Sequence, residues 1–234
     1  MHALTGFTKT DRSFFARDVL EVAPQLPGCV LERTDAGGTV AIRITEVEAY
    51  AGERDPGAHS YRGKTDRNAT MFGEPGHVYV YFTYGLHHAI NLVAGLAGQP
   101  YGCLVRAGRV VVGEPLARSR RENGPGVIGP RVAPLRDRDL ARGPGNVARV
   151  FGVTRADDGD DLFGGAWRFL IPGAPTGLAP ATGPRVGVSG PGGDGAHFPW
   201  RFWTADDPTV SAYRPGKAGR VGGQGASERP TLDG

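Results

Sequence analysis

The sequence predicts a single domain of the α+β class that combines β-strands with short helical segments. Its 234 residues are enough for one well-buried core, and 39% of them are hydrophobic. Three stretches, at 40–50, 76–84 and 87–93, alternate apolar with other residues, which is typical of half-buried strands. Asp18-Val-Leu-Glu21 resembles a capping box, the arrangement of side chains that opens a helix.

The N-terminal elements lead into the strand at 40–50. A short helix is expected after Asp18, and Pro24 is expected to kink it. The glycine-containing stretch 34–38 lies between the apolar residues Leu31 and Val40. This pattern predicts a hairpin that leads into the central strand.

The strand at 40–50 is unusual because the predicted character of one face changes along its length. With a period of two, that face contains Val40, Ile42, Ile44, Glu46, Glu48 and Tyr50. Burying an unpaired carboxylate costs on the order of several kcal/mol, so the two acids need a cleft, a partner or a chemical role. The alternative is that the strand leaves the core at Thr45.

The stretches 76–84 and 87–93 predict two antiparallel strands. Tyr79, Tyr81 and Thr83 are predicted on one face of the first strand, and Val78, Val80 and Phe82 on the other. Tyr84-Gly85-Leu86 is expected near the tip of this hairpin, where a tyrosine has no core to enter. Tyr84 is therefore either an ordinary surface residue or a wedge that enters a stack of bases.

A further strand of mostly apolar residues carries Arg106. A nearly buried guanidinium needs a carboxylate, and Glu48 and Glu46 are both candidates. Glu46 is expected to be a structural acid, paired with Arg106 or Arg43. The combination suits one chemistry: aromatic rings stack on an extruded base, while a carboxylate activates a water molecule against a sugar carbon.

Composition and charge limit the possible partners. The net charge is +3, and eleven arginines stand against four acids between Arg106 and Arg155. This excess either favours phosphate contacts or reflects a chain that prefers arginine to lysine. No membrane span, secretory signal or disulfide framework is expected, so the predicted compartment is reducing and intracellular. We expect one domain at 1–215 and a disordered, glycine-rich tail at 216–234.

Several motifs occur in an order and spacing that resemble a known family. They are Arg43-Ile-Thr-Glu-Val-Glu-Ala-Tyr50, Ala58-His-Ser60, Arg67-Asn68, Met71-Phe72, Gly76-His-Val-Tyr-Val-Tyr81, Tyr84-Gly85, Asn91 and Leu104-Val-Arg-Ala107. Together they are similar to the motifs of the alkyladenine (3-methyladenine) DNA glycosylase family. The resemblance runs from residue 13 to 213 and is most specific between 42 and 107.

The resemblance implies a role for each matching residue. Glu48 would be the general base that activates the hydrolytic water, and Arg106 would hold that water and orient Glu48. The residues implied to bind the substrate are Tyr50, His59, Tyr81, Asn91, Leu104 and Val186, of which Asn91 would disfavour a guanine 2-amino group and Val186 would offer a backbone contact to the water. The residues implied to contact DNA are Tyr84, Leu86, His87, Lys64, Thr65 and Arg67, with Tyr84 as the intercalating wedge.

The resemblance also implies a compact single domain with a curved antiparallel β-sheet, flanking helices and a protruding β-hairpin. It implies no metal and no organic cofactor. The expected partner is double-stranded DNA that contains alkylated or deaminated purines such as 3-methyladenine, hypoxanthine and ethenoadenine. The protein is expected to be a monomer in the cytoplasm, associated with the nucleoid through DNA binding.

The residues themselves favour hydrolysis without lyase activity. A bifunctional glycosylase needs an activated amine, and the lysine nearest the motifs, Lys64, stands in a polar loop. Asn146 departs from the family's pattern, because lysine is frequent at that position and supplies a DNA-backbone contact. The segment 108–134 has no clear counterpart in the family. The run Trp200-Arg-Phe-Trp203 is predicted to pack in the core and at a sheet edge rather than to bind a ligand.

Three alternative functions fit parts of the pattern. A non-catalytic nucleic-acid-binding protein would use Tyr84 and the arginines, but it would give Glu48 no task. A nucleoside N-glycosidase would use Glu46 together with Glu48 and would need no protruding aromatic residue. A metal hydrolase would use His87 and His88, which point to opposite faces of a strand and are therefore poor joint ligands.

Overall fold

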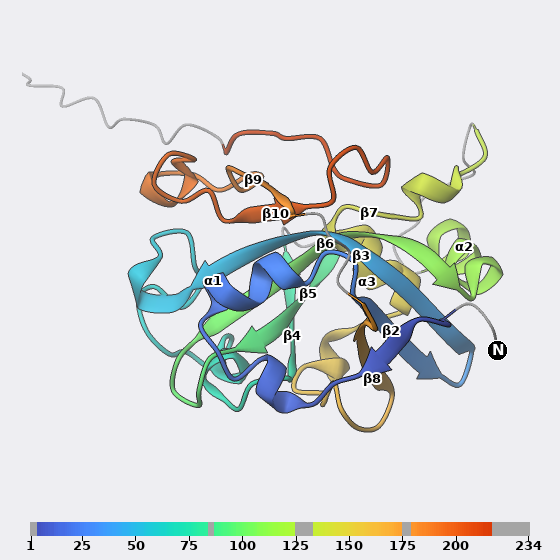
Figure 1. Cartoon of the computed structure of the whole chain (residues 1–234), viewed down its shortest axis with the longest axis horizontal. Coiled ribbons are helices and arrows are strands. Elements are labelled where there is room, and N and C mark those ends of the chain that lie inside the picture. Colours follow the sequence, from blue (N-terminus) through green and yellow to red (C-terminus); the bar gives the residue numbers. More distant parts are fainter. Residues whose placement is uncertain (1–3, 84–86, 125–132, 175–178, 217–234) are drawn as a thin grey trace, which may run out of the picture.

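The computed structural model describes residues 4–83, 87–124, 133–174 and 179–216, and it confirms the α+β class. The strands are β1 (Phe7–Lys9), β2 (Val30–Asp35), β3 (Gly38–Ala51), β4 (Val78–Thr83), β5 (His87–Ala94), β6 (Tyr101–Val112), β7 (Ala141–Arg142), β8 (Trp167–Pro172), β9 (Ala181–Gly183) and β10 (Arg201–Trp203). They form one curved antiparallel sheet in the order β1-β8-β2-β3-β6-β5-β4, with β7 added to β6 and β10 added to β3 and β9 (Figure 1).

The helices described are short. They are α1 (Val19–Val22), α2 (Glu114–Asn123), α3 (Pro144–Phe151) and the 3-10 turns η1 (Arg12–Phe14), η2 (Ala23–Gln25), η3 (Gly52–Arg54), η4 (Ala69–Phe72), η5 (Asp137–Asp139), η6 (Arg155–Asp157) and η7 (Pro191–Gly193). The predicted helix start is confirmed, because the Asp18 side chain accepts a hydrogen bond from Leu20 N at 2.9 Å. Pro24 ends the α-helical hydrogen bonding, and the chain continues as the tighter η2.

β3 is the longest strand, with 14 residues, and crosses the whole molecule in Figure 1. It pairs with β2 through the predicted hairpin, whose turn is Ala36-Gly37. On its other side it pairs with β6 along almost its whole length. This central position explains why β3 supplies both core residues and pocket residues.

The predicted single face from Val40 to Tyr50 is wrong, because a β-bulge interrupts β3. Ile44 pairs with Gly108 and Glu46 with Ala107, so Thr45 is an extra residue without a partner on β6. An extra residue exchanges the two faces of a strand. Before the bulge Ile42 and Ile44 face the core; after it Val47, Ala49 and Ala51 do. Glu46, Glu48 and Tyr50 therefore lie on the opposite face, away from the hydrophobic core.

β4 and β5 form the predicted antiparallel hairpin. Thr83 pairs with His87, which leaves three connecting residues, 84–86, and these lie outside the described residues. Val78 and Val80 enter the main core, while Tyr79 and Tyr81 lie on the other face, as the alternation predicted.

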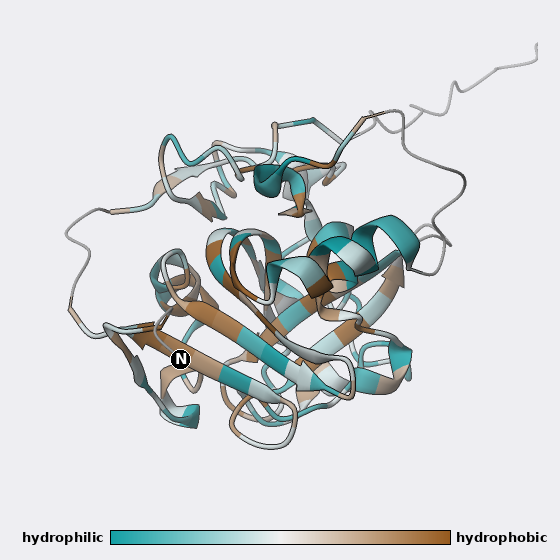
Figure 2. Ribbon diagram, turned by 90° about the vertical axis from the view of Figure 1, so that its right-hand side faces the viewer, coloured by the Kyte–Doolittle hydropathy of each residue, from teal (hydrophilic) through white to brown (hydrophobic). Residues whose placement is uncertain are grey.

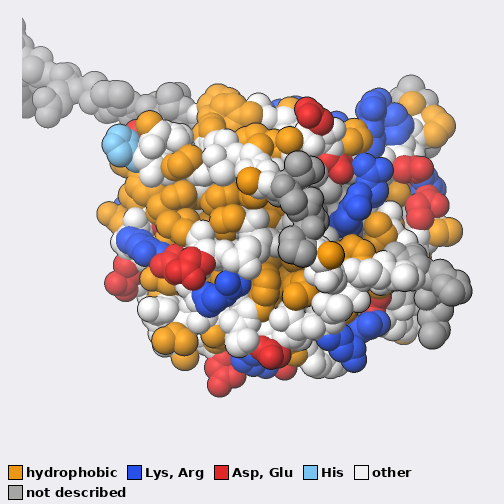
Figure 3. Space-filling view, in the orientation of Figure 1, with side chains coloured by type: hydrophobic (Ala, Val, Ile, Leu, Met, Phe, Trp, Pro, Cys, Tyr) orange, Lys and Arg blue, Asp and Glu red, His pale blue; other side chains and the backbone are white. Residues whose placement is uncertain are grey.

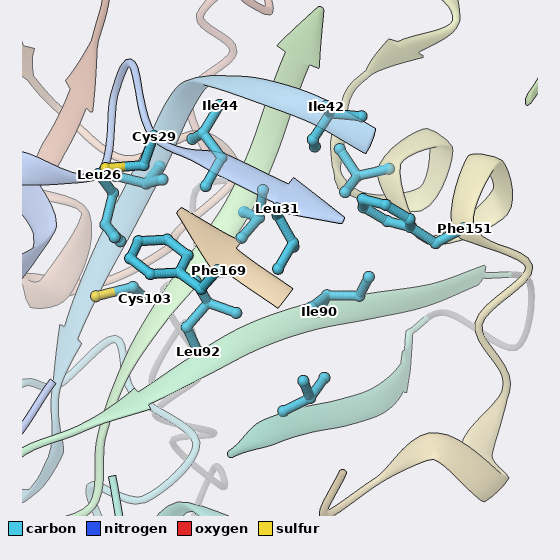
Figure 4. Close-up of a cluster of buried hydrophobic side chains, with 14 of the residues drawn as sticks. Leu26, Cys29, Leu31, Ile42, Ile44, Ile90, Leu92, Cys103, Phe151 and Phe169 are labelled. Carbon is cyan, nitrogen blue, oxygen red and sulfur yellow. The ribbon is translucent and has the colours of Figure 1, made fainter. Parts of the chain in front are cut away.

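The core fills the space between the sheet and the elements packed on it. Its side chains come mainly from β2 to β6, β8, α1 and α3, and in Figure 4 Leu31 (β2), Ile42 (β3), Ile90 (β5), Phe151 (α3) and Phe169 (β8) converge. Each fully buried side chain of this size stabilises the fold by about 1.5–3 kcal/mol relative to exposure. One contiguous cluster of this kind is consistent with a single domain.

α2 and α3 complete the side of the molecule that lies on the right in Figure 1. α3 begins with Gly143, in a conformation with φ +96°, followed by Pro144, and it ends at the left-handed Gly152. α2, which faces the viewer in Figure 2, is mostly hydrophilic outside Leu116 and Ala117. Within the described ranges no helix is both long and apolar enough to span a bilayer.

Candidate active site

Glu48 is the centre of a network of hydrogen bonds. Its side chain is completely buried. Oε1 accepts a hydrogen bond from Val186 N at 2.6 Å and lies 3.3 Å from Arg106 Nη1. Oε2 accepts a hydrogen bond from the Tyr50 hydroxyl at 2.8 Å. Three donor groups therefore lie against the two oxygens of the Glu48 carboxylate and fix its orientation.

Arg106 reaches both acids because β6 has its own bulge there. Glu46 pairs with Ala107 and Val47 pairs with Val105, so Arg106 is the residue left over on β6. Its Nε donates to Glu46 at 2.9 Å. Burial acts against its charge, but the negative charges of Glu48 and Glu46 outweigh burial and raise the pKa of Arg106. The guanidinium therefore remains charged.

The predicted pairing of Glu46 with Arg106 is confirmed, and Arg201 is a second arginine partner. Arg201, on β10, donates from Nε to Glu46 Oε1 at 2.7 Å. Ser211 donates to the same carboxylate from its hydroxyl at 2.8 Å and from its backbone N–H at 2.7 Å. Both carboxylate oxygens are thus occupied, whereas Arg43 is exposed. The pattern that pointed to Arg106, a lone arginine in an apolar run, also marks Arg201.

The Tyr50 hydroxyl stays protonated and donates its hydrogen bond to Glu48. Burial first, and then the negative charge of Glu48, raise the pKa of the Tyr50 hydroxyl well above its usual value. The ring lies 4.6 Å from the guanidinium carbon of Arg185, which is itself buried and bonded to Asp55 at 2.5 and 2.6 Å. The interpretation of the sequence missed this pair, because 130 residues separate its members.

A pocket of about 610 Å³ opens beside this network. Its wall combines aromatic side chains with glycine-rich backbone. The lining residues are Tyr50, Pro56, Gly57, His59, Met71, Tyr79, Tyr81, His87, Ala89, Asn91, Leu104, Arg106, Gly143, Pro144, Gly145, Asn146, Val186, Gly187, Val188 and Ser189. All six predicted substrate-binding residues are among them, together with Arg106 and His87.

The aromatic wall is built around Tyr81. The His59 ring meets it edge-on at 4.6 Å, and Tyr79 stacks behind it at 5.7 Å. Part of His59 reaches solvent, but partial burial and the positive charge of Arg67 lower the pKa of its imidazole. His59 is therefore uncharged at neutral pH and presents a neutral ring to the pocket.

Asn91 and Leu104 are paired residues on β5 and β6 and lie side by side on the inner wall. Asn91 is 4% exposed, and its side-chain nitrogen has no hydrogen-bond partner among the described groups. A buried amide without a partner is unfavourable until a ligand supplies an acceptor. The inner wall thus has one polar group available beside an apolar surface.

The predicted DNA-binding residues divide into three sets. Lys64, Thr65 and Arg67 are exposed on the loop before η4, and Arg67 donates to the Phe82 carbonyl of the hairpin at 3.3 Å. His87 lies in the pocket wall. Tyr84 and Leu86 belong to the connection between β4 and β5, which lies outside the described residues.

The two adjacent histidines point in different directions. His87 lines the pocket, while the His88 ring packs against Phe82 at 5.1 Å. In the described part of the chain no group of three or more His, Cys, Asp or Glu side chains could hold a metal ion. The geometry at these two residues therefore argues against their acting as joint ligands.

Several arginines of the basic stretch hold α2 in place. Arg118 bonds Glu114 and Asp137, each at 2.6 Å, and Arg120 bonds Asp35 at 2.7 Å. On the face in Figure 3, arginine and lysine side chains lie beside acidic ones. Part of the arginine excess thus serves the fold. Asn146 donates to the Arg142 carbonyl at 2.6 Å and has no charge to offer a phosphate.

Comparison with known proteins places this chain in a family. The family model described as methylpurine-DNA glycosylase (MPG) matches residues 13–208. A Streptomyces avermitilis protein named "Putative 3-methyladenine DNA glycosylase" is 50% identical over 219 residues, covering 92% of this chain and 96% of the relative. Relatives with the same name from Leifsonia xyli and Corynebacterium glutamicum are 49% and 46% identical, over 87% and 82% of this chain and 92% of each relative.

The chain belongs to the methylpurine-DNA glycosylase family. The match covers most of the described residues, including β3, the β4–β5 hairpin, β6 and β10. The family resemblance expected from the motifs is therefore confirmed.

Proposed function

We propose that this DNA glycosylase is monofunctional and hydrolyses the N-glycosidic bond of alkylated or deaminated purines, with Glu48 as the base that activates water. The observation that carries the proposal is the position of Glu48. Its carboxylate is held by Arg106, the Tyr50 hydroxyl and the Val186 N–H, and these three partner residues line the pocket. Purines of the 3-methyladenine, hypoxanthine and ethenoadenine class are the proposed substrates.

The pocket suits a base that has left the duplex. Tyr50, His59 and Tyr81 supply aromatic surfaces, and each stacking contact with a base contributes about 1–3 kcal/mol. A cationic alkylated base gains further from the electron-rich faces of tyrosine. Because His59 is neutral, it does not repel such a cation. These gains offset the few kcal/mol, roughly, that unstacking a base requires.

The proposed reaction is a displacement at the sugar C1′. Glu48 takes a proton from water, the oxygen of that water forms a bond to C1′, and the C1′–N bond breaks as its electron pair leaves with the base. The Val186 N–H is engaged by Glu48, so its carbonyl is the backbone group that remains for the water. Arg106 is the second proposed contact to the water and keeps the Glu48 carboxylate in place.

We propose that Asn91 discriminates among purines. Its side-chain nitrogen is a donor that faces the pocket without a partner. A guanine 2-amino group is also a donor, so the two groups repel each other and compete for the same space. Leu104 beside it offers only apolar contact, which suits the C2–H edge of adenine and hypoxanthine.

The DNA contacts are proposed around the hairpin. Tyr84 would fill the gap left by the extruded base, with Leu86 and His87 beside it. Lys64, Thr65 and Arg67 stand on an adjacent exposed loop from which they reach phosphates.

Hydrolysis rather than lyase chemistry is proposed because no lysine is among the described residues that line the pocket. Lys64 is exposed, and its nitrogen lies 6.0 Å from the Phe72 ring. A water molecule is therefore the better nucleophile. We also propose that residues 1–215 form the one functional domain, and that it acts as a monomer on double-stranded DNA in the cytoplasm, at the nucleoid.

The test compares the wild type with Glu48→Gln on duplexes that carry one hypoxanthine or one ethenoadenine. Strand breaks from the wild type alone, formed only after alkali, support a monofunctional glycosylase with Glu48 as its base. Breaks before alkali would show lyase activity. Tight DNA binding without excision of these bases, or of 3-methyladenine in alkylated DNA, would favour the binding protein. Equal activity on free nucleosides would favour the nucleoside N-glycosidase.

A further inference from the structure

Arg185 and Asp55 form an ion pair that is completely buried next to the pocket. Both side chains are 0% exposed, and Arg185 Nη1 and Nη2 bond Asp55 Oδ2 and Oδ1 at 2.5 and 2.6 Å. A bidentate pair of this kind fixes the orientation of the guanidinium. Because desolvation offsets most of its attraction, a buried pair adds little net stability, and its effect lies mainly in geometry.

The guanidinium of Arg185 also reaches the strand that carries Glu48. Nη1 donates at 2.9 Å to the carbonyl of Ala49, the residue between Glu48 and Tyr50. The guanidinium carbon lies 4.6 Å from the centre of the Tyr50 ring, whose hydroxyl donates to Glu48. Arg185 thus holds the backbone and the ring that aim the Tyr50 hydroxyl at Glu48 Oε2.

Arg185 acts on a second donor to Glu48 through the chain itself. Val186 follows it directly and donates its N–H to Glu48 Oε1 at 2.6 Å. Nη2 of Arg185 donates to the Gly192 carbonyl at 2.8 Å, which ties the loop that contains Val186 back onto the guanidinium. One side chain therefore positions two of the three donors that hold the Glu48 carboxylate.

We propose that Arg185, held by Asp55, is a positioning residue for hydrolysis, because it aligns the Tyr50 hydroxyl and the Val186 N–H on the two oxygens of Glu48. This inference rests on the proposed function, in which Glu48 is the base. The third donor, Arg106, comes from β6 and is independent of this pair. Without Arg185 the Glu48 carboxylate keeps Arg106 as its fixed partner. The carboxylate can then rotate, and the oxygen lone pair that must accept the proton of the water loses its orientation.

The test uses Arg185→Met, Arg185→Lys and Asp55→Asn, beside a matched control, Arg33→Met. Arg33 is also a largely buried arginine paired with aspartate, at 2.5 Å from Asp157, and it lies 5.7 Å from the Trp167 ring. Arg33 is not among the described residues that line the pocket, and its described hydrogen bonds go to Asp35, Asp157 and the Phe151 carbonyl, so it reports the general effect of losing a buried ion pair. Single-turnover excision of hypoxanthine and DNA affinity are measured for each protein.

Arg185→Met is expected to lower the single-turnover rate about 100-fold, because small misplacements of a reacting group have effects of that order. DNA affinity stays within about threefold, since the lost contacts do not face the duplex. Arg185→Lys recovers part of the rate, because a lysine ammonium can still donate to Asp55 or to the Ala49 carbonyl. Arg33→Met does not show this rate loss.

Two sets of results would overturn different statements. Equal rate losses for Arg185→Met and Arg33→Met, or no recovery of rate by Arg185→Lys, would overturn the positioning role. If Arg185→Met does not fold, Asp55→Asn and Arg185→Lys decide the same question: each should lose more rate than Arg33→Met while DNA affinity is kept, and rates equal to that of Arg33→Met would overturn the role. No excision by the wild type, or normal excision by Glu48→Gln, would overturn the proposed function itself, and the inference with it.

Discussion

A comparison of the single variants Glu46→Gln and Glu48→Gln distinguishes a structural role of Glu46 from the proposed role of Glu48 as the base. The two carboxylates are two residues apart on β3 and are equally buried. Glu46 accepts hydrogen bonds from Arg106, Arg201 and Ser211, which contributes both its hydroxyl and its N–H. Glu48 accepts two hydrogen bonds from uncharged donors and contacts Arg106 at a longer distance, 3.3 Å.

The expected stabilities follow from these contacts. Glu46→Gln leaves two buried guanidiniums with one fewer carboxylate, and removing one partner of a buried pair costs about 3–5 kcal/mol. In a chain of this size each kcal/mol lowers Tm by about 2–4 °C, so the loss is about 6–20 °C. Glu48→Gln keeps most of its neighbours satisfied and is expected to cost about 1–3 kcal/mol. Its excision rate falls about 100- to 10,000-fold, the range for losing a general base.

Thermal unfolding and single-turnover excision, measured at a temperature where both variants are folded, give the two quantities independently. Glu46→Gln is expected to lose mainly stability, and Glu48→Gln mainly rate. The reasoning is refuted if the order is reversed, with Glu48→Gln close to wild-type rate and Glu46→Gln inactive but stable.

Three further outcomes are expected. The NMR titration midpoint of His59 lies below its usual pKa of about 6.5, and Arg67→Ala raises it, because a positive charge that disfavours protonation is removed; an unmoved midpoint would contradict this. Burial raises the pKa of Cys29 to about 12 and that of Cys103 further, so thiol reagents should label both only after unfolding. Gly113→Ala should lower Tm, since φ is +72° and a Cβ would meet a carbonyl oxygen at 2.0 Å.

The strands and the family could be predicted from the sequence, because alternation and motif order are local properties. The face of β3 on which Glu48 lies could not be predicted. A period of two assigned Glu46 and Glu48 to the same face as Ile42 and Ile44. In the structure Thr45 lacks a partner on β6, and this extra residue exchanges the two faces. Such a bulge depends on which residue of the neighbouring strand is paired, and a period of two within one strand carries no information about that.

The ion pairs that hold Asp55 and Glu46 could not be predicted from the sequence either. Asp55 is separated from Arg185 by 130 residues, and Glu46 from Arg201 by 155. No local pattern links such positions, and only the closure of the sheet brings them together. The charge of the segment 106–155 was similarly ambiguous, because an arginine that bonds Asp35 and one that awaits a phosphate look the same in composition.

The late position of β10 has a consequence for the newly made chain. Val186, Arg201 and Ser211, which bond Glu48 and Glu46, are synthesised well after β2 to β6. A ribosome-bound or truncated product that ends before residue 185 contains β2 to β6 but cannot complete the cage around either acid. Folding that depends on such distant contacts is slow. Under the proposed function, a fragment of this kind is expected to excise no bases, because Glu48 lacks the Val186 N–H that holds its carboxylate.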